Sequence, residues 1–203
     1  MELDVYLSRV EVPVIAHEAS LARVAGIDRR VGQLTADELR AVRLAGGDAY
    51  VPTLAEALEV LRDVPVMVEL KQNRPRAGRL EERTAEVLDA HGGPYCVASF
   101  NPSSVRWFLD SRPEVIRVLT ATAHSDGWLP AAIGRRLAAL KDLAKVRPHG
   151  VSYDLKSLPH PATDAWRAAG GVLVTWTAVG PEGLARARTV ADNIIFEDVL
   201  PAR

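Results

Sequence analysis

The sequence predicts an α/β fold built on a parallel sheet. We expect an incomplete barrel of the (β/α)₈ type, in which about seven of the eight strands are present. Two observations lead to this prediction. Short β-rich runs alternate with longer helical runs along almost all of the 203 residues, which is typical of parallel sheets. Most β-rich runs are also apolar through their middles, as expected for strands buried on both faces.

The predicted strands are spread along the whole chain. They cover residues 2–7, 66–70, 95–99, 115–120, 150–153, 172–176 and 193–196. The helices predicted between them cover residues 54–61, 78–91, 102–110, 131–145, 161–169 and 181–189. The first helix follows Thr53, with Glu56 three residues later, which is the pattern of a capping box. The helix at 102–110 begins with Pro102 after Asn101, a favoured arrangement at a helix start.

Residues 9–52 interrupt the alternation. They contain an expected hairpin partner strand at 12–16, a loop rich in Gly, Asp and Arg, and a small helix that opens at Thr35. We interpret this region as an insertion on one face of the fold. The chain as a whole, residues 1–203, is then expected to form a single domain.

Composition excludes several classes of protein. Hydrophobic residues make up 48% and charged residues 25% of the chain, the balance of a globular protein with a core. The formal net charge of −1 gives no reason to expect nucleic acid as a partner. Cys96 is the single cysteine, so an internal disulfide is impossible. With no transmembrane run and no signal-peptide pattern, we expect a cytoplasmic protein.

Polar residues on two of the strands are candidates for a metal site. Glu2 and Asp4 are two positions apart on the first strand and therefore point to the same face; Glu69 and Lys71 are spaced alike. Where the two strands adjoin, three carboxylates and one ammonium converge. Carboxylates that lie close together need a cation between them, and oxygen ligands suit Mg²⁺ or Ca²⁺. The alternative is that Glu2 lies at a frayed end and that Glu69 and Lys71 form a surface pair.

Two other residues at strand ends could contribute to a site. His17 follows an apolar run and leads into the insertion, where a histidine can act as a general acid or base near neutral pH. Trp176 ends another strand, and an aromatic ring there can form the floor of a small-ligand pocket. For both residues, a purely structural role is the alternative.

The motifs of the chain, taken in order, resemble those of glycerophosphodiester phosphodiesterases. The resemblance runs from one end of the chain to the other and keeps the order and approximate spacing of the family. The matching segments are Glu-Leu-Asp-Val at 2–5, Pro-Val-Ile-Ala-His at 13–17, Leu-Thr-Ala-Asp-Glu-Leu at 34–39, Val-Pro-Thr-Leu-Ala-Glu-Ala-Leu at 51–58, Val-Glu-Leu-Lys at 68–71, Ala-Ser-Phe-Asn-Pro at 98–102, Val-Thr-Trp-Thr at 174–177 and Asn-Ile-Ile-Phe-Glu-Asp at 193–198.

The resemblance implies a TIM barrel with a small insertion that hydrolyses glycerophosphodiesters to glycerol 3-phosphate and an alcohol, using a divalent cation. It implies that the metal ligands are Glu2, Asp4 and Glu69. His17 would be one of two catalytic histidines. Lys71 would help to hold the phosphate, and Trp176 would line the glycerol side of the pocket.

The chain departs from the family pattern at one important place. In the family, a His-Arg motif at the end of the first strand supplies the second catalytic histidine and a phosphate-binding arginine, and these 203 residues contain no His-Arg pair. We therefore expect an N-terminally truncated domain with impaired activity, or a non-catalytic relative that binds a metal or a phosphorylated ligand. An unrelated barrel enzyme acting on a sugar phosphate is a third alternative. A barrel that lacks one strand has an open seam, which a second copy of the chain could close as a homodimer.

Overall fold

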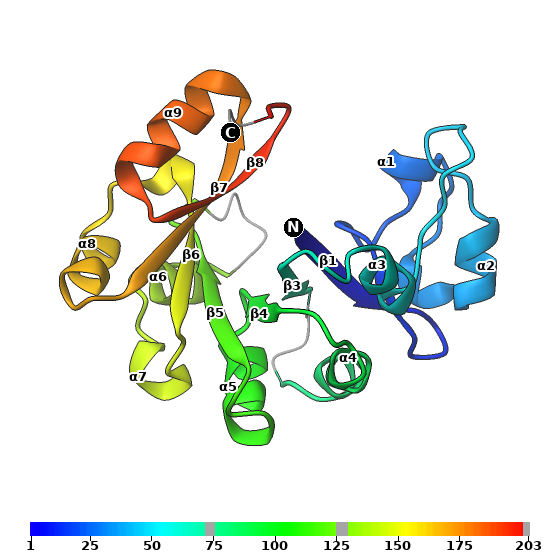
Figure 1. The fold of residues 1–203 in the computed structure, drawn as a ribbon, viewed down its shortest axis with the longest axis horizontal. Coiled ribbons are helices and arrows are strands. Elements are labelled where there is room, and N and C mark those ends of the chain that lie inside the picture. Colours follow the sequence, from blue (N-terminus) through cyan, green and yellow to red (C-terminus); the bar gives the residue numbers. More distant parts are fainter. Residues whose placement is uncertain (72–75, 125–129, 201–203) are drawn as a thin grey trace.

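The computed structural model describes residues 1–71, 76–124 and 130–200. Its centre is an eight-stranded curled sheet with the strand order β2-β1-β3-β4-β5-β6-β7-β8 (Figure 1). The strand β2 pairs with β1 in antiparallel fashion, and the pairs from β1 to β8 are parallel. The strands are β1 (Glu2–Leu7), β2 (Pro13–Ile15), β3 (Val66–Leu70), β4 (Tyr95–Ser99), β5 (Ile116–Ala121), β6 (Gly150–Asp154), β7 (Val172–Val179) and β8 (Asn193–Glu197).

The predicted strands are all present, and the α/β class is confirmed. The hairpin partner expected at 12–16 is β2. The main difference is β7, which the sequence pattern ends at Trp176 and the structure extends to Val179. An irregularity in the ladder between Thr175 and Ala178 shifts the register, so that Ala178 and Val179 still pair with β8.

The helices are α1 (Ala22–Ala25), α2 (Ala36–Ala41), α3 (Leu54–Val60), α4 (Arg79–Asp89), α5 (Pro102–Ser111), α6 (Ala131–Ala138), α7 (Leu143–Val146), α8 (Pro161–Ala168) and α9 (Gly180–Val190), with short 3₁₀ turns η1 (Val31–Gln33) and η2 (Leu155–Ser157). Helices α3 to α9 cover the outer side of the sheet, and α1 and α2 lie in the insertion beside it (Figure 1). The capping box before α3 is formed: Glu56 N donates to Thr53 Oγ1 at 3.2 Å, and Thr53 N donates to Glu56 Oε2 at 2.8 Å. Among the described residues, no helix is both long and apolar enough to cross a membrane.

The predicted helix at 131–145 is wrong as a single element. The structure divides it into α6 and α7. Leu140, between them, has φ of 50°, a left-handed backbone conformation that a continuous right-handed helix cannot contain. The turn is braced by Arg136, whose Nη2 lies 2.7 Å from Oδ1 of the buried Asp142.

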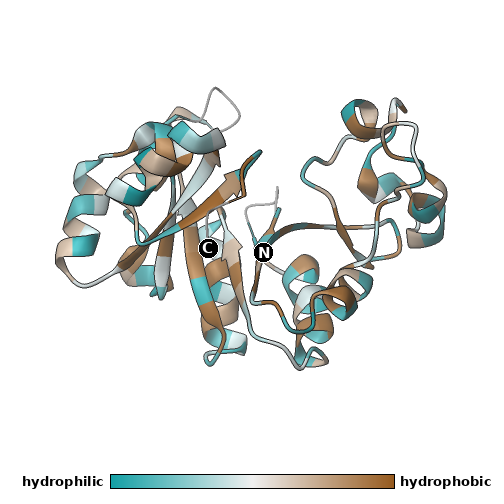
Figure 2. Cartoon of the chain, turned by 45° about the horizontal axis from the view of Figure 1, so that its top comes forward, coloured by the Kyte–Doolittle hydropathy of each residue, from teal (hydrophilic) through white to brown (hydrophobic). Residues whose placement is uncertain are grey.

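Alternate residues of each strand face the helices and form the main core. Val5, Val68 and Val97 of three neighbouring strands pack with Leu58 of α3 and Leu88 of α4. A second cluster joins β5, β6 and β7 to the helices that follow α4. Figure 2 shows the strands mostly in hydrophobic colours, while the helices carry both hydrophobic and hydrophilic residues. Because side chains alternate along a strand, the other set of strand residues points into the concave side of the sheet.

Residues 9–52 hold a small core of their own. It is built from Val14, Leu21, Val31, Leu34, Leu39 and Val51, all of them buried. Helix α2 inside this region begins with a second capping box, in which Glu38 N donates to Thr35 Oγ1 at 3.1 Å. The region is joined to the sheet through β2, because Tyr6 of β1 pairs with Val14 and also packs against this core.

Candidate active site

Three carboxylates meet on the concave side of the sheet, at β1 and β3. Asp4 and Glu69 are register partners on these parallel strands, and Glu2 precedes Asp4 by two positions on the same face. Each of the three carboxylates, Glu2, Asp4 and Glu69, has an oxygen that lies within 4.8 Å of an oxygen of the other two. The structure thus brings together the three side chains that the strand spacing places on one face.

Lys71 completes this cluster. Its Nζ lies 3.0 Å from Asp4 Oδ1 and 3.0 Å from Glu69 Oε1. Its side chain is 17% exposed, and those of Asp4 and Glu69 are 12% exposed, so water screens these ion pairs only in part. The backbone at this position is also fixed, because Lys71 N donates to Val5 O at 3.1 Å. The alternative of a surface pair between Glu69 and Lys71 is therefore wrong.

The cluster changes the proton affinity of its members. Burial, reinforced by the charges of Asp4 and Glu69, raises the pKa of Glu2 to about 8. Burial also raises the pKa of Glu69, against the opposing effect of Lys71. The pKa of Lys71 is raised because the two neighbouring carboxylates outweigh its burial. Negative charge is therefore in excess here.

The donor set fits a divalent cation. Three carboxylates and one ammonium leave a formal surplus of two negative charges when all four groups are ionised. The donors are all oxygen atoms, the type that Mg²⁺ and Ca²⁺ prefer. The raised pKa of Glu2 follows from its burial and from the negative charges of Asp4 and Glu69 beside it.

His17 lies just beyond the end of β2. Ala16 N donates to Asp4 O at 3.0 Å, which fixes this turn against the strand that carries Asp4. The His17 side chain is 68% exposed, and its Nδ1 lies 3.9 Å from Glu18 Oε1. Within the described parts of the chain, His17 forms no hydrogen bond or ion pair with the three carboxylates. His17 thus follows a residue whose backbone is hydrogen-bonded to Asp4, and its ring is exposed to solvent.

Trp176 and Phe100 form an aromatic pair on the concave side of the sheet. Their ring centroids are 5.5 Å apart in an edge-to-face arrangement. Trp176 Nε1 is buried and has no hydrogen-bond partner among the described residues. The backbone of Trp176 pairs with Asp154 at the end of β6. The two rings thus lie together on the concave side, with Phe100 directly after β4 and Trp176 inside β7, three residues before its end.

The sequence arguments missed two polar groups near these strand ends. The first is Tyr6, whose pKa is raised chiefly by burial, and which also feels the charges of Lys71, Asp4 and Glu69. Its position two residues after Asp4 on the same face was a usable signal.

The second group is the buried Asp154. Its Oδ2 accepts hydrogen bonds from Thr122 Oγ1 at 3.0 Å and Ser157 Oγ at 3.2 Å, and its Oδ1 accepts one from Lys156 N at 2.9 Å. The position of Asp154 at the carboxyl end of β6 is a signal that sequence alone offers. These bonds tie the segments after β5 and β6 together beside Trp176.

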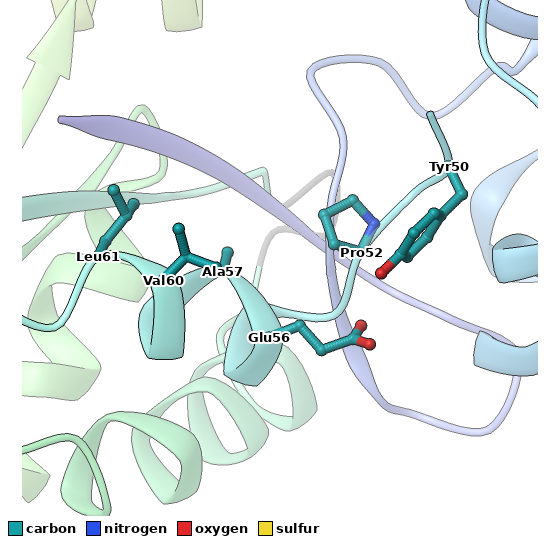
Figure 3. A pocket seen from close by; sticks show the side chains of 6 residues that line it. All are labelled: Tyr50, Pro52, Glu56, Ala57, Val60 and Leu61. Carbon is teal, nitrogen blue, oxygen red and sulfur yellow. The ribbon is translucent and has the colours of Figure 1, made fainter. Parts of the chain in front are cut away.

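A surface pocket of about 330 Å³ lies elsewhere, on α3 and the segment before it (Figure 3). It is lined by Tyr50, Pro52, Glu56, Ala57, Val60 and Leu61. Its carboxylate, Glu56, is paired with Arg40, whose guanidinium carbon also lies 5.1 Å from the centroid of the Tyr50 ring. None of the predicted site residues lines this pocket.

Comparison with solved structures gives the same fold. A phosphodiesterase from Oleispira antarctica, solved in complex with the product sn-glycerol-3-phosphate, is similar with a TM-score of 0.79 and 22% identity, over 96% of this chain and 79% of that one. A glycerophosphodiester phosphodiesterase from Thermotoga maritima is similar with a TM-score of 0.69 and 21% identity, over 96% of this chain and 80% of that one. At these identities the likeness shows the fold.

Comparison at the level of sequence matches part of the chain to a curated protein and almost all of it to a family model. Lysophospholipase D GDPD1 of Rattus norvegicus is 29% identical over an alignment of 85 residues, and the match covers 36% of this chain and 27% of that protein. The chain thus matches little more than a quarter of the length of this curated relative. The model of the glycerophosphoryl diester phosphodiesterase family matches residues 1–198, almost the whole chain. This chain therefore belongs to the glycerophosphoryl diester phosphodiesterase family.

Proposed function

We propose that this chain carries the cation and phosphate half of a divalent-cation-dependent glycerophosphodiester phosphodiesterase. The reaction would yield glycerol 3-phosphate and an alcohol, and would place the protein in the metabolism of glycerol and phospholipids. The observation that supports this proposal most directly is the cluster of Glu2, Asp4 and Glu69 beside Lys71, in a chain of this family. The unrelated sugar-phosphate enzyme is excluded by the family.

The roles we propose follow from the chemistry of each group. Glu2, Asp4 and Glu69 would hold Mg²⁺ or Ca²⁺, and a cation bound there would neutralise charge on the phosphoryl oxygens. Lys71 would hold another phosphoryl oxygen, which carries more negative charge as the transition state forms. His17 would move a proton, because its ring is exposed and it follows Ala16, whose backbone is hydrogen-bonded to Asp4.

The aromatic pair gives the apolar side of the site. Trp176, with Phe100 against it, would contact the carbon atoms of the glycerol group. The product named for the Oleispira antarctica structure, sn-glycerol-3-phosphate, is a ligand of this chemical type. We expect sn-glycerol 3-phosphate to bind this chain in the presence of the cation.

We further propose that full activity needs a His-Arg segment that these 203 residues do not contain. The sheet offers a place for it. In the part of the chain that the structure describes, β8 pairs with β7 alone, and β2 with the following Ala16 covers the outer edge of β1 only from Asp4 onward. A strand inserted between β8 and β1 would complete a barrel as one domain, and the His-Arg pair would then face the carboxylates. The nucleotide sequence upstream of Met1 tests this: an in-frame His-Arg codon pair after an apolar strand supports it, and a stop codon contradicts it.

The second candidate function is binding without turnover. It is favoured by the solvent-exposed His17, which has no partner histidine at the cluster in the described structure. A homodimer that closes the two free sheet edges also belongs to this proposal, and light scattering would show it as twice the mass of the chain. The cytoplasmic location stays a prediction of the sequence.

Two measurements separate the candidates. Choline release from glycerophosphocholine, with and without Ca²⁺ or Mg²⁺, reports turnover; calorimetry with sn-glycerol 3-phosphate reports binding. Hydrolysis that depends on the cation and is lost in His17→Ala supports the enzyme. His149→Asn is the matched control, because His149 precedes β6 and so lies at the opposite end of the sheet. Binding without any choline release supports the second candidate where the upstream sequence encodes no His-Arg pair, and neither binding nor release contradicts both.

A further inference from the structure

The ammonium group of Lys71 stands within the carboxylate cluster itself. Nζ is 3.0 Å from an oxygen of Asp4 and 3.0 Å from an oxygen of Glu69, two of the three proposed cation ligands. Both oxygens belong to largely buried side chains. Lys71 therefore supplies, from within the chain, part of the positive charge that a bound cation would supply.

Lys71 and a divalent cation make competing demands on these oxygens. Mg²⁺ and Ca²⁺ bind carboxylate oxygens at roughly 2.0–2.6 Å. The oxygens of Asp4 and Glu69 would then be shared between the cation and Nζ, or turned away from Nζ. The double charge of the cation would also lie next to the single charge of Lys71. Water reaches this site only in part, so the two cations repel each other strongly.

The backbone and the side chain of Lys71 differ in how firmly they are held. The backbone is fixed to β1 by the hydrogen bond from Lys71 N to Val5 O, at 3.1 Å. The side chain is an unbranched four-carbon stem with a rotatable ammonium group, which can change partners without moving the strand. A phosphoryl group bound beside the cation offers oxygens of comparable charge.

We propose that Lys71 competes with the cation for Asp4 and Glu69, and that a phosphoryl ligand removes this competition by taking Lys71 as its own partner. This inference rests on the proposed function, because it takes the three carboxylates as cation ligands. Its consequence is that cation and phosphoryl ligand bind cooperatively. The coupling is reciprocal, and Lys71 carries it.

Calorimetric titration with Ca²⁺, with and without sn-glycerol 3-phosphate, tests the coupling in three proteins: wild type, Lys71→Met and Lys145→Met. Met keeps most of the length of the lysine stem and removes its charge. Lys145 is exposed on α7, which lies between β5 and β6 in the chain and so belongs to a part of the fold away from β1 and β3. Its variant should therefore match the wild type. We expect Lys71→Met to bind Ca²⁺ alone about tenfold more tightly than the wild type. We expect sn-glycerol 3-phosphate to raise the Ca²⁺ affinity of the wild type and to leave that of Lys71→Met nearly unchanged.

The outcomes distinguish this inference from the proposed function. Ca²⁺ binding to the wild type with no gain of affinity in Lys71→Met overturns the inference alone. Absence of Ca²⁺ binding in all three proteins overturns the proposed cation site and the inference together.

A second measurement needs no variant. Reductive methylation of the wild type, followed by peptide mass spectrometry, gives the reactivity of Lys71 against Lys141, Lys145 and Lys156 as internal references. Ca²⁺ should raise the relative reactivity of Lys71, because it frees the amine from its two carboxylates. An unchanged or lowered reactivity of Lys71 contradicts the inference.

Discussion

Asp4 and Glu69 are direct register partners on the neighbouring parallel strands β1 and β3. Their separation is therefore fixed by the backbone ladder of the sheet, and loops take no part in it. Sites built on strands hold their geometry better than sites built on loops. The sheet itself thus holds the carboxylates of Asp4 and Glu69 side by side.

Glu69→Gln should weaken Ca²⁺ binding by about tenfold or more, because it replaces a charged ligand with a neutral one of the same shape. Calorimetry at constant pH measures this change. Glu86→Gln is the matched control, because Glu86 is exposed on α4 and pairs with Arg83. Equal Ca²⁺ affinities in Glu69→Gln and the wild type would exclude Glu69 as a ligand.

The stability of the cation-free protein should fall as the pH rises from about 5 to about 8. The pKa of Glu2 is about 8 in the folded protein and 4.5 as its ordinary value, so in this range the folded state holds a proton that the unfolded state has released. Stability supplied by that proton is complete below the lower pKa and is lost as the pH passes the higher one. Urea unfolding in EDTA at successive pH values measures the effect.

Two comparisons check the assignment of this pH dependence to Glu2. The variant Glu2→Gln has no proton to lose at this position, so its unfolding free energy should depend less on pH. Saturating Ca²⁺ should reverse the trend in the wild type, because the cation displaces the proton and binds more tightly at higher pH. An unfolding free energy that responds to pH equally in Glu2→Gln and the wild type would refute the assignment.

Asp154→Ala should lower the free energy of unfolding by about 1–3 kcal/mol, because it removes the acceptor of the Ser157 hydroxyl and of Lys156 N, and one of the two acceptors of Thr122 Oγ1. Asp28→Ala is the control. Asp28 is exposed in the insertion, and a surface substitution of this kind changes stability by about 0.5 kcal/mol or less. Denaturant unfolding of both variants gives the comparison, and equal stabilities would show that the Asp154 bonds contribute nothing.

Two adjacent glycines, Gly92 and Gly93, allow a closely matched comparison of two substitutions. A Cβ at Gly93 would lie 2.4 Å from the carbonyl oxygen of Arg62, whereas a Cβ at Gly92 would have no atom within 4 Å. Gly93→Ala should therefore destabilise the protein by about 1–3 kcal/mol through a forced backbone shift. Gly92→Ala should leave stability unchanged or slightly higher. Thermal unfolding of the two variants measures the difference, and the reverse order would contradict the packing described for Gly93.

The sheet could be predicted from the sequence because each parallel strand is buried on both faces and so appears as an apolar run. Polar residues inside such runs then identified the cluster, since Glu2, Asp4 and Glu69 have no place in an apolar strand unless they face a site. Period-two spacing also placed Lys71 correctly.

Features that depend on single backbone angles or on distant partners could not be predicted in this way. The left-handed conformation of Leu140, which divides one predicted helix into two, leaves no pattern in the surrounding residues. The Asp154 network joins groups 32 positions apart, Thr122 and Asp154, which no local spacing connects. The solvent exposure of His17 is likewise set by how the insertion folds back.

The strand β1 belongs to two cores at once. Val5 is buried in the main core between sheet and helices, while Tyr6, the next residue, packs against the separate core of residues 9–52. In native-state hydrogen exchange, the amides of the insertion and those of β1 should therefore open together as one cooperative unit. Loosening of the insertion would therefore also loosen the strand that carries Glu2 and Asp4, so the two carboxylates depend on a core to which neither belongs.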